Sequence, residues 1–592
     1  MNEMKRTVTC GELSAANAGQ EVVLNGWVHR HRDHGGILFI NLRDRYGITQ
    51  TVVDQDAPAE LMAKAEALKM EYCVAIKGIV QKRPDEMVNK DMSTGSIEVV
   101  VKELEVLSTS EVLPFMIDGD SEANENLRLK YRYLDLRREE MQRNIKLRAD
   151  VSYRTREYLT QQGFLELETP TLIKSTPEGA RDFLVPSRLQ AGKFYALPQS
   201  PQLYKQLLMV SGFDKYFQIA RCYRDEDARG DRQLEFTQID MEMSFVSAED
   251  VYSMTEGMMK HIFKTTLNVD LNLPFKRLSY HDAMNTYGSD KPELRFDMPF
   301  KDFAEFVPGS EFGVFKSVLD EGGAVKALKV PGCAHYSRKM ITDLENIAKH
   351  YGAKGMAWMK VTAEGLEGGV SKFFTEQSQQ IISYLEAQEG DLILFGAGPW
   401  STACTSLGAV RSQLGKDLNL CDPNKFEFCW IVDFPLFEWN EEENKWDPCH
   451  HMFTMPQSQY LETMEQDPGE VKGDLYDLVL NGYELASGSI RCHDSNVQKR
   501  IFDIVGFDPE EAKERFGFLL DSFQYGPPPH GGIAPGLDRL VMIMCGEDSI
   551  REVIPFPKNS VGVSPMDDAP AVVDDQQMKD LHLVLNLPED KE

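Results

Sequence analysis

The chain has 592 residues, of which 42% are hydrophobic and 27% are charged, and its formal net charge is -30. Its length is too great for a single hydrophobic core and its apolar content too high for a disordered chain, so we expect several packed domains. No apolar run is long enough to span a membrane, and residues 1–13 lack the apolar stretch of a signal peptide, which predicts a cytoplasmic protein with no membrane span. The acidic balance argues against a nucleic-acid partner unless cations gather locally.

The ten cysteines are scattered singly, with no Cys-x-x-Cys pair. This spacing argues against a zinc ribbon, a redox motif and a disulfide framework. Cys449, His450 and His451 are adjacent, but neighbours on a strand point to opposite faces, so we expect no zinc site there.

Residues 1 to about 110 predict a small β-barrel. Five short β-rich runs, with one helical stretch at 57–69 between the third and fourth, favour an OB-type barrel; the runs are 22–28, 37–42, 49–53, 73–80 and 97–107. The predicted loop side mixes cations with an aromatic ring, a combination typical of single-stranded RNA binding. The alternative is that these are ordinary surface side chains of the barrel. The residues concerned are Arg30, His31, Arg32, His34, Phe39, Arg43, Arg45 and Gln50.

The next segments predict a linker near 108–125 and a long helix at 139–162, ended by Gly163 as a C-terminal cap and followed by a β-like run at 164–169. Between residues 128 and 156 the chain has ten Lys/Arg and four Asp/Glu, which gives a local net charge of +6. On charge alone, a solvated and salt-bridged helix face is the favoured interpretation of this run. Residues 290–420 show an α/β alternation of their own and predict a domain inserted within another.

Two β-like runs follow each other at 217–226 and 236–243, joined by a polar loop. In the second run, polar and apolar residues alternate with a period of two, so Gln238, Asp240 and Glu242 share one face. An amphipathic surface strand would show the same alternation. An antiparallel pair would place these side chains beside Gln218 and Arg224 on an open sheet floor.

These residues lead to a family resemblance. Arg224-Asp225-Glu226, the loop and Phe236-Thr237-Gln238-Ile239-Asp240 resemble motif 2 of the class II aminoacyl-tRNA synthetases. The helix and strand ending at Pro170 resemble motif 1, and Gly536-Leu537-Asp538-Arg539-Leu540 resembles motif 3. Within the class, the stretches 131–137, 177–182, 199–205 and 488–491 are similar to the aspartyl family, and the insertion fits its bacterial branch, whose insertion is shared with an amidotransferase subunit.

The resemblance implies an α+β multi-domain fold and a homodimer formed through motif 1. The expected parts are an OB-fold anticodon-binding barrel at 1–110, a hinge at 111–140, an antiparallel class II catalytic sheet flanked by helices at 141–289 and 421–560, an inserted GAD-like α/β domain at 290–420, and a C-terminal extension at 561–592. The implied activity is that of an aspartate–tRNA ligase, which joins L-aspartate to ATP as aspartyl-adenylate, releases pyrophosphate, and transfers aspartate to the 3' end of tRNA(Asp).

Adenylate formation needs positioned cations more than a general base, because the enzyme mainly aligns the reactants and neutralises phosphate charge. We expect Arg224 to bridge the α-phosphate and the attacking carboxylate, and Arg539 to hold the γ-phosphate; structural ion pairing is the alternative for both. Asp477 and Glu484, on one strand-like run at 476–485, offer hard oxygens for Mg²⁺, or are merely solubilising acids on an edge strand. The resemblance adds further ATP-binding residues: Asp225, Glu226, Gln233, Gly536, Leu537 and Asp538.

Selection of aspartate requires compensation of a second carboxylate, and Lys205 with Arg491 supplies two cations for it. Asparagine would leave them unpaired, at a cost of about 2–5 kcal/mol. The resemblance adds Glu178, Gln202, Asp240 and His450 to the amino-acid site; for His450, packing beside Phe453 is the alternative. An asparagine or lysine enzyme of the same subgroup is disfavoured by the two cations. A non-catalytic tRNA-binding or amidotransferase-accessory protein should have lost the phosphate-binding residues that are present here.

Anticodon reading is assigned by resemblance to Phe39 for stacking and to Arg32 and Gln50 for base-edge contacts, with Arg30 nearby. In the bacterial family, the position after Arg32-Asp33 differs between enzymes that charge only tRNA(Asp) and those that also charge tRNA(Asn). Here it is His34, which favours relaxed specificity, whereas the second such position, near Glu86, lacks the glycine typical of relaxed enzymes. Both alternatives stay open, and charging of tRNA(Asn) would imply an amidotransferase partner.

Overall fold

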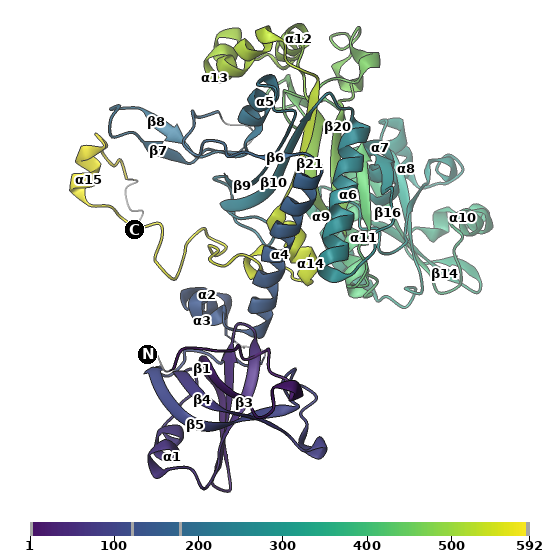
Figure 1. The fold of residues 1–592 in the computed structure, drawn as a ribbon. Helices are drawn as coiled ribbons and strands as arrows, with labels where there is room; N and C mark the ends of the chain where they lie inside the picture. Colours follow the sequence, from purple (N-terminus) through teal and green to yellow (C-terminus); the bar gives the residue numbers. More distant parts are fainter. Residues whose placement is uncertain (1–3, 120–122, 177–179, 588–592) are drawn as a thin grey trace. The chain divides into compact units, whose positions relative to one another are not determined.

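The computed structural model describes residues 4–119, 123–176 and 180–587, which fall into two compact units (Figure 1). The smaller unit runs to Arg143 and includes Ser564–Asp568, and the larger unit holds the rest. Within the described residues, none of the helices combines the length and the apolar character needed to cross a bilayer.

The smaller unit contains a closed five-stranded barrel in the order β1-β2-β3-β5-β4. Its strands are β1 (Glu21–His34), β2 (Ile37–Asp44), β3 (Gly47–Val53), β4 (Cys73–Lys82) and β5 (Ile97–Ser108), and α1 (Ala59–Glu66) lies between β3 and β4 in the chain. Leu24, Ile40 and Ile76 are fully buried in its core. The predicted OB-type barrel is confirmed. One detail was wrong: β1 and β2 extend to a tight hairpin, so the cations from Arg30 to His34 lie on a strand rather than in a loop.

Two short helices, α2 (Glu125–Lys130) and α3 (Arg132–Asp135), end the smaller unit. The buried Asp135 carboxylate pairs with three arginines, at 2.6 Å from Arg132, 3.0 Å from Arg128 and 3.3 Å from Arg138. Three arginines of the basic run are therefore salt-bridged, but around a buried carboxylate rather than on the solvated helix face that the charge pattern favoured.

The larger unit is built on an eight-stranded sheet in the order β11-β17-β20-β21-β22-β10-β9-β6. Neighbouring strands are antiparallel except for the pairs β11–β17 and β6–β9. The strands are β6 (Leu165–Glu166), β9 (Lys215–Tyr223), β10 (Glu235–Ser244), β11 (Lys276–Ser279), β17 (Phe428–Val432), β20 (Leu475–Leu480), β21 (Tyr483–Ile490) and β22 (His530–Pro535).

Helices α4 (Glu139–Gln161), α6 (Ala248–Leu267) and α14 (Leu537–Cys545) cover one face of this sheet (Figure 1). Side chains such as Val151, Met259 and Val541 share a core there with Ile239 and Met241 of β10. Gly163 follows α4 with φ 83°, a left-handed conformation that suits the predicted cap. The predicted strand at 164–169 shortens to the two residues of β6.

A second, five-stranded sheet has the order β12-β13-β16-β14-β15. Its strands are β12 (Phe300–Asp302), β13 (Ala324–Val330), β14 (Ala357–Thr362), β15 (Gly365–Glu367) and β16 (Leu392–Gly398). Helices α9 (Arg338–His350) and α11 (Trp400–Asp417) share a core with one face, and α8 (Gly313–Asp320) and α10 (Ser378–Leu385) share one with the other. The α/β alternation expected for 290–420 thus corresponds to a sheet of its own, and α7 (Tyr280–Tyr287) precedes it.

The remaining elements are short or peripheral. They are β7 (Leu184–Pro186), β8 (Phe194–Ala196), α5 (Gln202–Val210), β18 (Phe437–Asn440), β19 (Lys445–Pro448), α12 (Ser495–Val505), α13 (Pro509–Ser522) and α15 (Asp575–Asp580).

Candidate active site

The face of the eight-stranded sheet that points away from α4, α6 and α14 is polar at β10, because that strand alternates. Ile239 and Met241 point into the helix-covered core, so Gln238, Asp240 and Glu242 point the other way. Asp240 lies opposite Gln218 on β9, and Glu242 lies opposite Gly532 on β22. The antiparallel pair expected from the sequence is present with the expected polar floor.

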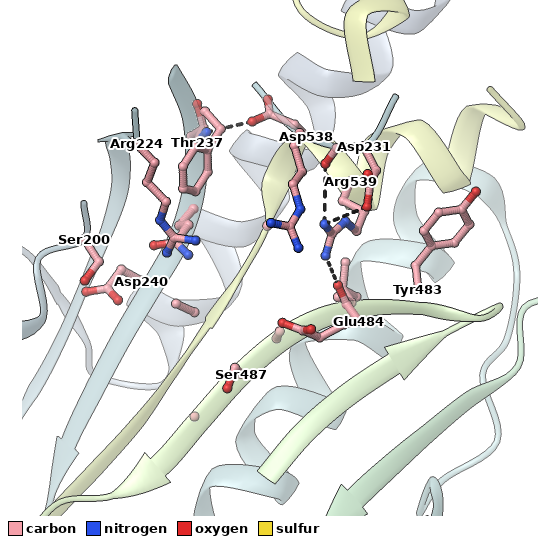
Figure 2. A pocket seen from close by; sticks show the side chains of 18 of the residues that line it. Ser200, Arg224, Asp231, Thr237, Asp240, Tyr483, Glu484, Ser487, Asp538 and Arg539 are labelled. Carbon is pink, nitrogen blue, oxygen red and sulfur yellow. Dashed lines mark hydrogen bonds and ion pairs between the residues drawn. The ribbon is translucent and has the colours of Figure 1, made fainter. Parts of the chain in front are cut away.

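A pocket of about 640 Å³ opens on this floor (Figure 2). It is lined from β10, the β20–β21 hairpin, α5, α14 and the loops beside them. Most of the residues singled out in the sequence for ATP or aspartate line it, namely Gln202, Lys205, Arg224, Glu226, Gln233, Asp240, His450, Glu484, Arg491, Gly536, Asp538 and Arg539.

Three other predicted residues, all of them described, do not line this pocket. Leu537 is buried in the helix-covered core, and Asp225 interacts with Arg181 at 3.6 Å. Asp477 is buried in β20. Glu178 belongs to residues 177–179, which lie outside the described residues.

Arg224 follows β9 and extends into the pocket. Its guanidinium carbon lies 5.0 Å from the centre of the Phe236 ring, and its Nη1 atom is 3.9 Å from Glu226. Stacking on the ring holds the planar group while leaving its donors available. A guanidinium held in this way can bind a planar anion such as a carboxylate or a tetrahedral anion such as a phosphate.

Arg539, near the start of α14, approaches the same space. It pairs with Asp231 at 3.0 Å and donates a hydrogen bond to the main-chain carbonyl of Glu484. In Figure 2 the guanidinium groups of Arg224 and Arg539 extend into one open space above β21. Asp538, in contrast, accepts from the Thr237 backbone at 2.7 Å and pairs with Arg148 at 2.5 Å, so its carboxylate fastens α14 to the sheet.

Several buried polar atoms around the pocket have no hydrogen-bond partner within the described residues. Leaving such an atom unpaired costs about 1–3 kcal/mol, which a ligand that pairs it would recover. They are Gln202 Nε2, Arg224 Nε, Gln233 Nε2, Asp240 Oδ2, Asp477 Oδ1 and Arg539 Nε.

Lys205 and Arg491 form a buried four-charge cluster with Asp240 and Glu242. The Lys205 ammonium lies 2.6 Å from Asp240 and 3.3 Å from Glu242, and Arg491 donates to both oxygens of Glu242 at 2.9 and 3.1 Å. Desolvation would raise the pKa of Glu242, but Arg491 and Lys205 outweigh it and hold that pKa below its usual value.

This cluster corrects one part of the sequence argument. The two cations are not unpaired charges waiting for the substrate, because two carboxylates already balance them. Desolvation raises the pKa of Asp240, and Lys205 opposes that shift only in part. What the pocket presents is a set of N–H donors fixed in place, together with one Asp240 carboxylate oxygen that has no hydrogen-bond partner in the described part of the chain.

His450 and His451 both line the pocket, which was not expected for adjacent residues on a strand. The reason is that β19 ends at Pro448, so the histidines lie in a loop. His450 stands edge-on to Phe434, with ring centres 5.1 Å apart, rather than beside Phe453. His451 receives a hydrogen bond from Arg491 at 3.0 Å, and desolvation together with that guanidinium holds the pKa of His451 well below its usual range.

Asp477 and Glu484 lie on two strands of a hairpin, not on one run. The Asn481-Gly482 turn separates β20 from β21, and both strands are interior to the sheet, so the edge-strand alternative is wrong. Desolvation and the nearby Glu484 carboxylate raise the pKa of Asp477 well above its usual value. A buried carboxylate with a free oxygen, beside a second acid that faces the pocket, fits a partial ligand set for Mg²⁺.

The barrel carries a second pocket, of about 450 Å³. It is lined by Arg32, Asp33, His34, Phe39 and Gln50, which includes four of the five residues predicted to contact tRNA. Arg30 lies elsewhere, in an ion pair with Asp118.

The sequence argument missed several lining residues, including Ser200, Asp231, Lys291 and Ser487. Ser200 and Asp231 lie within stretches that the sequence already singled out, so those stretches could have identified both as residues of the site. Ser487 directly precedes the stretch 488–491, so it had a similar signal. Lys291 had none, because it reaches the pocket through packing between distant parts of the chain.

Comparison with family models gives two matches. Residues 124–560 match tRNA synthetases class II (D, K and N), and residues 22–107 match an OB-fold nucleic acid binding domain. The first match covers well over half of the chain.

Full-length relatives agree with it. A protein of Treponema denticola named aspartate–tRNA(Asp/Asn) ligase is 66% identical over 588 residues, which cover 99% of this chain and 100% of the relative. A Macrococcus caseolyticus protein named aspartate–tRNA ligase is 50% identical, covering 98% of this chain and 99% of the relative.

Among solved structures, an asparaginyl-tRNA synthetase from Pyrococcus horikoshii in complex with asparaginyl-adenylate is similar with a TM-score of 0.59 and 21% identity, covering 93% of this chain and 97% of that one. At this identity the likeness concerns the fold.

Proposed function

Because the chain belongs to the class II tRNA synthetases of the D, K and N group, we propose that the pocket on its eight-stranded sheet is where aspartate and ATP react. The protein is an aminoacyl-tRNA synthetase, a ligase that uses ATP to charge tRNA with aspartate. The assignment of individual residues below is our proposal.

The observation that carries this proposal is the buried cluster of Lys205, Asp240, Glu242 and Arg491. Among the described residues, Asp240 Oδ2 has no hydrogen-bond partner within bonding distance, and it would accept the substrate ammonium. Lys205 and Arg491 offer only N–H donors, and Glu242 keeps both in position. The carboxylate of aspartate can accept from them, whereas the amide NH₂ of asparagine would face them donor to donor. Gln202, His450 and Glu178, the last of which lies outside the described residues, would complete the amino-acid site.

In the first step, a carboxylate oxygen of aspartate attacks the α-phosphorus of ATP. A C–O–P anhydride bond forms, the bond from the α-phosphorus to the bridging oxygen breaks, and pyrophosphate leaves with the electron pair. Arg224, stacked on Phe236, would hold the α-phosphate and the attacking carboxylate together, and Arg539 would hold the γ-phosphate. Glu226, Gln233 and Gly536 line the pocket where the nucleoside would lie.

A magnesium ion would neutralise phosphate charge during this step. Glu484 faces the pocket, and Asp477 behind it has an unpaired buried oxygen. We assign the ion to these two acids, with phosphate oxygens and water completing its coordination.

In the second step, the terminal 3'-hydroxyl of tRNA attacks the carbonyl carbon of the adenylate, and AMP leaves. The barrel pocket would read the anticodon, with Phe39 stacking on a base and Arg32 and Gln50 contacting base edges. A homodimer, suggested by the motif 1 resemblance, is part of the same proposal.

The tRNA substrate has two candidates. The first is tRNA(Asp) alone. The second, tRNA(Asp) with tRNA(Asn), is favoured by His34 in the barrel pocket and by the name of the Treponema denticola relative, aspartate–tRNA(Asp/Asn) ligase. It would require an amidotransferase that converts the mischarged product.

Parallel charging of tRNA(Asp) and tRNA(Asn) transcripts with aspartate tests the proposal and separates its two forms. Transfer to one transcript or to both identifies the specificity. Failure to aminoacylate either transcript would contradict the proposed function.

A further inference from the structure

A short segment between α7 and β12 reaches the catalytic pocket from the side of the five-stranded sheet. Lys291 of this segment lines the pocket. Its neighbour Glu293 lies against the hairpin turn between β20 and β21, because a Cβ atom added to Gly482 would be 3.3 Å from Glu293 Cβ. Lys291 thus enters the pocket next to the hairpin that carries Asp477 and Glu484.

The Lys291 ammonium has neither an ion pair nor a hydrogen bond within the described residues. Its charge nevertheless acts on Asp477 of the hairpin, since it opposes the rise in the pKa of that carboxyl. By contrast, Lys205, which also lines the pocket, already pairs with two carboxylates. A cation that is exposed to the pocket and not already neutralised is available for an anionic ligand.

Helix α11, which packs on the five-stranded sheet, holds this segment by a buried clamp. Arg411 donates to the carbonyls of Met298 at 2.9 Å, Glu293 at 3.0 Å and Phe296 at 3.1 Å. Its guanidinium carbon also lies 4.2 Å from the centre of the Phe296 ring. Burial lowers the pKa of Arg411 to about 10, so the group still carries its charge at neutral pH.

The start of the segment is fixed to the same helix. A Cβ atom on Gly408 of α11 would lie 2.4 Å from the carbonyl oxygen of Gly288, so the two backbones touch. Trp400, the first residue of α11, donates its indole N–H to Asn285 at 2.9 Å. Anchors on both sides of Lys291 therefore belong to one helix.

We propose that Lys291 binds the β- and γ-phosphates of ATP, which leave as pyrophosphate, and that α11 is the scaffold that positions it through Arg411. The inference rests on the proposed function of the pocket and extends it. Arg539 contacts the carbonyl of Glu484 and Lys291 lies at the hairpin that carries Glu484, so two cations flank the proposed metal site. A flexible ammonium beside Mg²⁺ is suited to a polyphosphate chain. The five-stranded sheet thereby contributes to catalysis through the helix packed on it.

The test compares Lys291→Met with the unchanged enzyme in aspartate-dependent ATP–pyrophosphate exchange. Loss of one charge-assisted contact to a phosphate should raise the KM for ATP and the KM for pyrophosphate about tenfold. The KM for aspartate and the inhibition constant of AMP, which lacks these phosphates, should stay within about twofold. Lys291→Arg should restore part of the loss. Lys425→Met, at an exposed lysine paired with Glu427, is the matched control.

Unchanged KM values for ATP and pyrophosphate in Lys291→Met would overturn the inference, as would an equal rise in the inhibition constant of AMP. An unchanged enzyme that shows no aspartate-dependent exchange would instead contradict the proposed function, so the two failures are distinguishable.

Arg411→Lys tests the positioning role, because one ammonium cannot donate to three carbonyls in the guanidinium geometry. It should raise the KM for ATP and pyrophosphate selectively, and its effect should largely disappear in the Lys291→Met background. Additive effects of the two substitutions on these KM values in the double variant would overturn the scaffold role of α11. An equal rise in the KM values of all substrates would overturn it as well. Asn285→Ala, which removes the Trp400 contact, is a milder variant with the same expected pattern.

Discussion

Arg224 is held from one side by the Phe236 ring, while its Nε atom has no partner among the described residues. A lysine at this position would keep the charge but lose the planar fork and the stacking. We predict that Arg224→Lys lowers kcat/KM for aspartate-dependent exchange about 100-fold, which corresponds to about 2.7 kcal/mol of transition-state stabilisation.

The matched control is Arg221→Lys. Arg221 lies on β9, pairs with Glu235 and does not line the pocket. Its variant should retain activity within about twofold, as expected for an exposed ion pair. Equal losses in the two variants would mean that Arg224 acts through general surface charge.

The raised pKa of Asp477 predicts how the Mg²⁺ requirement of the exchange reaction depends on pH. Its pKa is raised above the usual value, so the proton leaves it at higher pH than from an exposed aspartate, and Mg²⁺ requires the ionised form. As pH falls through this raised pKa, the proton competes with the metal. The Mg²⁺ concentration for half-maximal exchange should therefore rise with falling pH, and high Mg²⁺ should restore activity.

Asp477→Asn should need more Mg²⁺ at every pH but lose most of this pH dependence. A dependence as steep in that variant as in the unchanged enzyme would place the titrating group elsewhere.

At the scale of elements, β22 passes so close to β10 that only a glycine fits beside Glu242. A Cβ atom on Gly532 would lie 2.1 Å from Glu242 Oε2 and 2.1 Å from the Met241 carbonyl. Gly532→Ala should lower the free energy of unfolding by about 1–3 kcal/mol through overpacking, and should raise the KM for aspartate by displacing Glu242 from Arg491. Thermal denaturation and exchange kinetics measure the two effects.

Gly517→Ala in α13 is the matched glycine control, since its added Cβ atom would meet nothing closer than Lys513 Cγ at 3.5 Å. Removal of a helical glycine should leave the free energy of unfolding unchanged or raise it by up to about 1 kcal/mol. If both glycine variants lost the same stability, close packing at Gly532 would not be the cause.

The elements also show where sequence reasoning was sufficient. The alternation in β10 predicted the polar floor because a strand's period of two depends only on local geometry. The hairpin of β20 and β21 was missed although the Asn481-Gly482 pair, which is typical of such a turn, was present in the sequence. In the structure these residues have φ values of 51° and 80°, as a two-residue hairpin turn requires. The interpretation of 476–485 as one run ignored that turn.

Other features could not be read from local patterns. Glu242 neutralises Arg491 across 249 positions of sequence, and Lys291 reaches the pocket because α11 holds its segment. Such contacts depend on which elements pack together, so the paired state of the cations and the role of Lys291 required the fold. The charge argument for Lys205 and Arg491 treated the cations as unpaired, whereas Asp240 and Glu242 balance them.

At the scale of the whole molecule, the two units carry different pockets. The barrel pocket has arginine, histidine and an aromatic ring, and the pocket of the larger unit has the guanidinium groups of Arg224 and Arg539. We predict that Phe39→Ala raises the KM for tRNA about tenfold or more, because stacking on a base contributes about 1–3 kcal/mol. Exchange without tRNA should be unaffected.

Tyr46→Ala removes another aromatic ring of the barrel, one that is exposed and outside the barrel pocket, and should change neither reaction. A loss of exchange activity in Phe39→Ala would contradict the separation of the two roles.

The most direct measurement of the central claim is ATP–pyrophosphate exchange by the purified protein with aspartate or asparagine as the only amino acid. Donor-only recognition by Lys205 and Arg491 predicts exchange with aspartate and a rate at least about 30-fold lower with asparagine, since a mismatched buried contact costs about 2–5 kcal/mol. Comparable exchange with asparagine, or none with aspartate, would contradict the account.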